Sequence, residues 1–211
     1  LGLALVVLAP AAEADVRWRS GAISTPAPMQ AGELAQAATE LAQRPGQSRF
    51  VVYFDGPVQP AQRAALEGSG IRLLDYLGDH AYFATMTPGL DAARFAAIPG
   101  TRFVEAIDAA NKLHPDLARG VAHSWTVVAD VDEVRTSPLV ALNVLFHKDF
   151  DLEGAADVVA KHGGFIQGEI SVINGVVVHL SMDRVAGLAA DDDVMYVEPP
   201  LPRLEGLNDS N

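Results

Sequence analysis

Hydrophobic and polar positions between residues 49 and 108 follow a pattern of short strands and helices. Residues 49–54 are almost all β-branched or aromatic and are followed by Asp-Gly-Pro, so they predict a strand that ends in a turn. Residues 59–67 are good helix formers, and Gly68 follows them where a helix C-cap belongs. The pattern continues with two strands joined by a hairpin, a helix and a last strand, at residues 71–77, 81–86, 90–97 and 102–107. The predicted order is βαββαβ.

The same order returns from residue 139 onward. The predicted strands and helices cover residues 140–146, 152–162, 165–171, 176–182, 184–190 and 194–197. Phe103 and Tyr196 are 93 positions apart, and so are Gly70 and Gly163. Because the same offset occurs at two distant landmarks, it indicates an internal duplication. We therefore predict an α+β fold of two tandem ferredoxin-like βαββαβ domains, each a four-stranded antiparallel sheet with two helices on one face.

The strands of this pattern carry apolar residues on both sides, as at residues 50–54 and 176–178. Sheets that are covered on both faces have such strands. Since the two predicted helices cover only one face, something else must cover the other. Either the two repeats cover each other or a partner does, and both alternatives stay open.

The remaining segments surround the two domains. We predict a partial signal peptide at residues 1–14, a lead-in arm at 15–48 with one helix at 31–43, a connector at 109–138 and a tail at 201–211. The two domains then occupy residues 49–108 and 139–200.

The N-terminus indicates export. Residues 1–10 form an apolar run, and the small residues Ala12 and Ala14 follow it as in a signal-peptide cleavage site. The run is shorter than the about 20 residues that span a bilayer, so we expect no stable membrane insertion. We expect cleavage after Ala14 and a secreted or periplasmic protein, with a buried helix as the alternative interpretation. No Met precedes Leu1, so we expect the sequence to start inside a longer reading frame.

Composition narrows the function classes. The 211 residues include 15 Lys and Arg against 27 Asp and Glu, a net charge of -12, so we expect no nucleic acid partner. The absence of cysteine excludes disulfides, thiolate metal sites and a cysteine nucleophile. Within residues 139–200 three basic side chains face ten acidic ones, and this charge predicts that the second repeat needs a partner to be well ordered.

Candidate chemistry is sparse. The six histidines show no i, i+4 pair for a metal, so we expect no metal and no cofactor; they are His80, His114, His123, His147, His162 and His179. Ser124 follows His123, but sequence neighbours point apart and no nucleophile elbow surrounds any serine, so we predict no catalytic residue. The triplet 191–193, all aspartates, lacks the spacing of a calcium loop and is predicted to be a solvated turn.

Four segments resemble a known family. They are Phe50-Val51-Val52-Tyr53-Phe54, residues 70–76, Ile98-Pro99-Gly100-Thr101-Arg102-Phe103-Val104 and Val194-Met195-Tyr196-Val197-Glu198-Pro199. They look like the N-terminal propeptide region of secreted bacterial subtilisin-like serine proteases, with two propeptide-like domains in tandem.

The resemblance implies an intramolecular chaperone and temporary inhibitor of a subtilisin-like protease domain that follows Asn211. This protease is the partner that we expect the second repeat to need, because of its charge and its open sheet face. The family's catalytic Asp, His and Ser motifs are absent from these 211 residues. The resemblance also implies a C-terminal tail that lies in the substrate cleft, and we assign this role to Leu204, Glu205, Gly206, Leu207, Asn208, Asp209, Ser210 and Asn211. The alternative is a secreted tandem ferredoxin-like module that binds a ligand or protein, with no protease attached.

Overall fold

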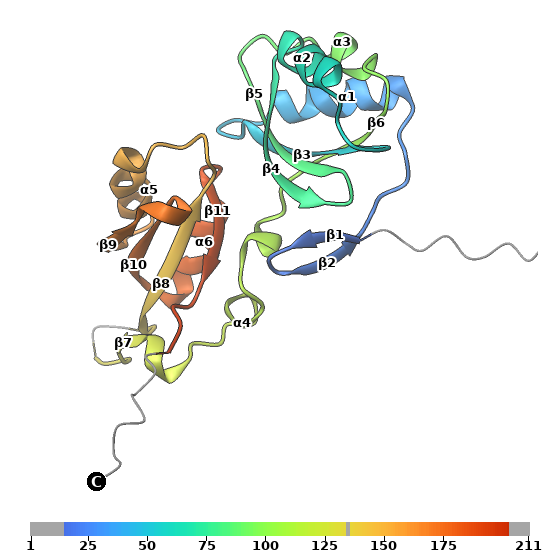
Figure 1. Ribbon diagram of the computed structural model, residues 1–211. Coiled ribbons are helices and arrows are strands. Elements are labelled where there is room, and N and C mark those ends of the chain that lie inside the picture. Colours follow the sequence, from blue (N-terminus) through green and yellow to red (C-terminus); the bar gives the residue numbers. More distant parts are fainter. Residues whose placement is uncertain (1–14, 134–135, 203–211) are drawn as a thin grey trace, which may run out of the picture.

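A computed structural model describes residues 15–133 and 136–202 (Figure 1). It has a mixed α+β fold with two large antiparallel sheets, one in each half of the chain, as the repeated pattern predicts, and a smaller two-stranded sheet in the arm. The predicted signal cleavage residues Ala12 and Ala14 and the predicted cleft-binding residues 204–211 lie outside the described residues. In the described part of the chain, no helix is long and apolar enough to cross a membrane.

The first sheet has the strand order β4-β5-β3-β6, and every neighbouring pair is antiparallel. Its strands are β3 (Arg49–Phe54), β4 (Ile71–Gly78), β5 (Ala81–Met86) and β6 (Thr101–Ala106). The bounds agree with the sequence to within one residue at each end, since turn residues flank each strand.

Three helices cover one face of this sheet (Figure 1): α1 (Ala31–Ala42), α2 (Pro60–Gly68) and α3 (Ala92–Ala96). A capping box on Gln59, with Pro60 in the first turn, sets the start of α2. Phe50 and Val52 point from β3 into the core below the helices, where they pack with Leu66 and Phe95. All four side chains are buried, so this face is a closed hydrophobic core.

The second sheet repeats the same strand order, β11-β8-β10-β9. Its strands are β8 (Leu139–Phe146), β9 (Phe165–Ile170), β10 (Gly175–Ser181) and β11 (Val194–Glu198). In both halves the fourth strand therefore lies beside the first, and the third lies between the first and the second. Asn174 makes the predicted hairpin turn with a positive φ of 49°, a conformation that Asn tolerates better than most residues.

Two short helices, α5 (Ala155–Lys161) and α6 (Val185–Ala189), cover one face of the second sheet. The 3-10 turns η3 (Leu152–Gly154) and η5 (Met182–Arg184) precede them. In the first place the sequence predicted one continuous helix at residues 152–162, and in the second it predicted a strand up to residue 182 and a helix at 184–190. Val159 and Leu188 are buried against Val140 and Leu142 of β8, which makes this core separate from that of the first half.

The arm contains a hairpin that the sequence analysis missed. Strands β1 (Asp15–Trp18) and β2 (Gly21–Ser24) pair with each other beside the first sheet (Figure 1). Trp18 packs on the sheet face opposite the helices, against Val51, Tyr53 and Phe83, with an edge-to-face contact of 5.3 Å to Phe83. The second face of the first sheet is therefore covered within the chain.

The predicted connector also contains ordered elements. They are η1 (Ala109–Lys112), α4 (Pro115–Ala118), η2 (Ser124–Thr126) and β7 (Val127–Ala129). Strand β7 pairs with β8, so the second sheet has five strands and begins before residue 139. The sequence missed this strand because three residues are too few to show a period.

Candidate functional site

The second sheet has a face that the chain leaves partly open. Cross-strand pairs show which residues share it, because directly paired residues point to the same side. His179 of β10 pairs with Ala141 on one side and Phe165 on the other, and Val177 pairs with Asn143. None of these five side chains is buried, and Phe165 is 50% exposed. The corresponding face of the first sheet is buried beneath Trp18, so the two sheets differ.

The chain leaves the second unit after β11. There the connector makes two hydrogen bonds, one to the end of β11 and one to Pro200. The backbone N–H of His114 donates to the carbonyl oxygen of Val197 at 2.9 Å. The indole Nε1–H of Trp125 donates to the carbonyl oxygen of Pro200 at 3.1 Å. Val197 and Pro200, which lead into the tail, therefore have a defined position against the connector.

Trp125 itself is supported by a cluster around Asp116 in α4. The rings of Trp125 and His123 stack with centroids 4.2 Å apart, and Nε2 of His123 lies 2.8 Å from Oδ2 of Asp116. Arg119 donates to the other carboxylate oxygen. The hydrogen bond from His123 and the charge of Arg119 hold the pKa of the Asp116 carboxyl below its usual value. His123 is thus engaged by Asp116 and Trp125, and the adjacent Ser124 is exposed.

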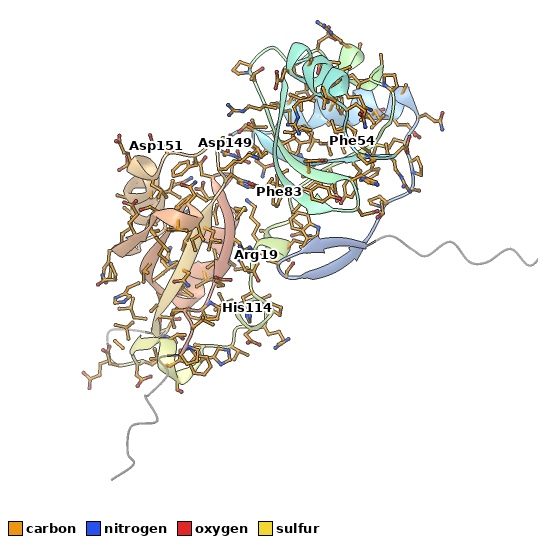
Figure 2. The ribbon with its side chains drawn as sticks, in the orientation of Figure 1. Arg19, Phe54, Phe83, His114, Asp149 and Asp151 are labelled. Carbon is orange, nitrogen blue, oxygen red and sulfur yellow. The ribbon has the colours of Figure 1, made fainter. Side chains whose placement is uncertain are left out.

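A second cluster joins the two units. Arg49, the first residue of β3, donates from Nε to Asp149 at 3.1 Å and from Nη1 to Asp192 at 3.2 Å and Asp193 at 2.7 Å. Its side chain is only 8% exposed. Burial alone would lower the pKa of Arg49, but the hydrogen bonds to Asp149 and Asp193 and their charges raise it above its usual value. In Figure 2, Asp149 lies where the two units meet.

The aspartate triplet 191–193 is therefore not the solvated turn that the sequence predicted. Asp192 also accepts hydrogen bonds from the backbone N–H and the hydroxyl of Ser48, both at 2.9 Å. Asp191 accepts from Lys161 at 2.9 Å and lies 3.2 Å from Nε2 of His162, and its side chain is 7% exposed. Although burial would raise the pKa of Asp191, these two partners hold it below its usual value. The prediction failed because the cations come from far away in the sequence.

Two buried titratable side chains lie beside this cluster. Lys112 is 3% exposed and donates to the backbone oxygen of Asp191 at 2.8 Å; burial lowers its pKa to about 8. His147 is fully buried, and neither ring nitrogen has a hydrogen-bond partner. Its ring meets Phe83 of the first sheet edge-on at 4.8 Å. Burial, helped by the charges of Lys112 and Arg49, lowers the pKa of His147 to about 2, so it stays neutral.

A cavity of about 270 Å³ opens where the hairpin and both sheets meet. Its lining is mostly aromatic and apolar, with Arg19, Asp75 and Asn111 as polar groups; the other lining residues are Trp18, Tyr76, Leu77, Phe83, Met195 and Tyr196. The Arg19 guanidinium lies over the Tyr196 ring at 5.7 Å and pairs with Glu198 at 3.6 Å. The charge of Arg19 in the cavity wall therefore already has partners within the protein.

Within residues 15–133 and 136–202, no group of three or more His, Asp or Glu side chains is placed to hold a metal ion. The sequence analysis did not single out Arg49, His147 or Trp125 as members of these clusters. Arg49 and His147 carry a weak signal, since Arg49 opens an otherwise apolar strand and His147 directly follows one. Trp125 stands in a segment without a repeating pattern, where we found no signal.

Comparison with known families adds one finding. Residues 17–110 match the model of a family described as a domain of unknown function (DUF8729). The match covers most of the β1/β2 hairpin, α1 and the whole first sheet, and it ends before α4. The chain matches none of the curated proteins with which it was compared.

Proposed function

We propose that this chain is the propeptide region of a subtilisin-like serine protease, which helps the protease domain to fold and inhibits it temporarily. In this proposal both units are ferredoxin-like domains, an assignment supported by the common strand order and by the helices on one face of each sheet. The chain itself is not the enzyme. The protease would follow in the same precursor, after export through the signal peptide.

The observation that carries the proposal is the difference between the two sheets. The first sheet is covered on both faces, by helices on one side and by Trp18 and Met195 on the other. The second keeps a half-exposed face with Val177, His179 and Phe165, and the tail leaves from the same unit. A partner that binds both a sheet face and an extended tail therefore finds both on the second unit.

The first unit then acts as a permanent accessory to the second. Arg49 and Ser48 neutralise and hold the acidic turn 191–193, which would otherwise repel itself. The contacts of the first unit lie at β11 and the end of β8, so they leave Ala141, Val177 and His179 free for a partner.

Sequencing beyond Asn211 is the first test, because the proposal requires a subtilisin-like catalytic domain there. The second test is inhibition of that protease in trans by a chain of residues 15–211. We expect removal of residues 204–211 to raise the inhibition constant at least about tenfold, since the strand in the cleft is lost. We expect a similar rise in the inhibition constant for Val177→Asp, because this substitution buries an unpaired carboxylate in the interface with the protease.

Ala186→Asp, on the exposed surface of α6, is the matched control and should inhibit like the unchanged chain. Circular dichroism of each variant confirms that it is folded. Equal inhibition by all four proteins, or the absence of a protease domain after Asn211, would contradict the proposal.

The cavity of about 270 Å³ favours a second candidate function, a secreted module that binds a small ligand or protein without any protease. Its aromatic lining and few polar groups are typical of ligand sites, although its volume is just below their usual range. Saturable binding of a small aromatic compound that quenches Trp18 fluorescence, in a chain that no protease follows, would favour this candidate.

A further inference from the structure

Residues 199–202, which lead into the tail, offer few backbone groups that could hold them in place. Pro199, Pro200 and Pro202 have no backbone N–H, so they cannot donate hydrogen bonds to a neighbouring strand. Only their carbonyl oxygens are available as anchors. The structure uses one of them, since the Pro200 oxygen accepts from Nε1 of Trp125 at 3.1 Å.

The donor is well placed for this role because its ring is fixed although it is 49% exposed. It stacks on His123 with an angle of 8° between the rings, and His123 is held in turn by Asp116 at 2.8 Å. Asp116 belongs to α4, which begins at Pro115. The residue before this helix, His114, donates its backbone N–H to the carbonyl oxygen of Val197 in β11. The chain of contacts thus runs from β11 through α4 and back to the tail.

We propose that Trp125 is a positioning residue that fixes the direction in which the tail leaves the second unit. It anchors the backbone at Pro200, so the residues that follow start from one point and one orientation. A partner that captures them then orders fewer residues on binding, and this preorganisation increases affinity. The partner is the protease of the proposed function, on which this consequence rests; the anchoring itself does not depend on it.

The anchoring is tested in the full chain with a fluorescent label in the tail. The protein has no cysteine, so Leu204→Cys gives a single labelling site. Trp125→Phe keeps a ring that stacks on His123 but removes the N–H donor. We expect this variant to lower the fluorescence anisotropy of the label, because the tail moves more freely. Tyr76→Phe, which changes an aromatic of similar exposure in the first unit, should leave the anisotropy unchanged.

A second measurement leaves Trp125 unchanged, so its result does not depend on whether the Trp125→Phe variant folds correctly. The protein has two tryptophans, so NMR resolves two indole N–H signals. We expect the Trp125 indole proton to exchange with water more slowly in the full chain than in a chain that ends at Glu198. Unchanged anisotropy in Trp125→Phe, or equal exchange rates in the two chains, would overturn the inference.

Inhibition of the protease tests the consequence. The loss of one neutral hydrogen bond is worth about 0.5–1.5 kcal/mol, so Trp125→Phe should weaken inhibition by about two- to tenfold. Anisotropy that changes in a chain that inhibits no protease would support the anchoring and reject the proposed function. Inhibition that is equal with and without the indole N–H would overturn the role in positioning.

Discussion

Replacing Arg49 with methionine is expected to lower the free energy of unfolding by about 3–5 kcal/mol, the usual cost of removing one partner from a buried ion pair. The Arg49 side chain is 8% exposed and is shared by Asp149, Asp192 and Asp193. Without it, Asp192 and Asp193 lose their arginine partner and Asp149 keeps its ion pair with the exposed Arg72 at 3.5 Å, while Lys112 is a buried cation beside them. We expect urea unfolding, followed by circular dichroism, to change from one transition to two as the units separate.

Arg63→Met is the matched control, since Arg63 is exposed on α2 and belongs to no cluster at the junction. Its effect should stay within about 0.5 kcal/mol, as for most surface substitutions. High salt should reduce the destabilisation in Arg49→Met, because it screens the repulsion among the remaining aspartates. A single transition with an unchanged midpoint would show that the cluster does not hold the units together.

The second large effect is a loss of stability when the pH is lowered, and we expect it to depend on His147. Its pKa is about 2 in the folded protein against an ordinary value of 6.5, so between these limits only the unfolded chain binds a proton there. A proton bound only in the unfolded state favours unfolding. The contribution of His147 is therefore fully present above pH 6.5 and declines as the pH falls, by about 1.4 kcal/mol per pH unit well below 6.5.

We expect His147→Leu to flatten this dependence between pH 6.5 and pH 4.5, and to be neutral or stabilising at pH 7 because it removes two ring nitrogens without partners. Denaturant titrations at several pH values measure the slope. His179→Leu, on the half-exposed face of the second sheet, should keep the slope of the unchanged protein. Equal slopes in all three proteins would show that His147 titrates normally.

The contacts of Arg49 and Lys112 change how the acidity of the second repeat is understood. The sequence predicted that this repeat needs its protease to be well ordered, because of its charge and its open sheet face. The structure provides one partner in the chain itself, since Arg49, Ser48 and Lys112 bind the aspartate turn from outside residues 139–200. That a protease stabilises this repeat further stays a prediction.

The sequence by itself determined the local elements and their repetition. Strand β3 and strand β5 have the predicted bounds, because β-branched and aromatic residues favour strands and turn residues follow them, Asp55-Gly56 after β3 and Pro88-Gly89 after β5. The turn at Asn174 follows from the ability of Asn to adopt a positive φ. Such signals are encoded within a few residues, so no knowledge of the fold is needed to find them.

Only the tertiary structure decided which face is closed and where the charges lie. Arg49 and Asp192 are 143 positions apart, and Trp125 and Pro200 are 75 positions apart. No period or spacing indicates such pairs, because they depend on how the two sheets and the connector pack. The β1/β2 hairpin was missed for a related reason, since four-residue strands owe their stability to the surface that Trp18 buries rather than to their own pattern.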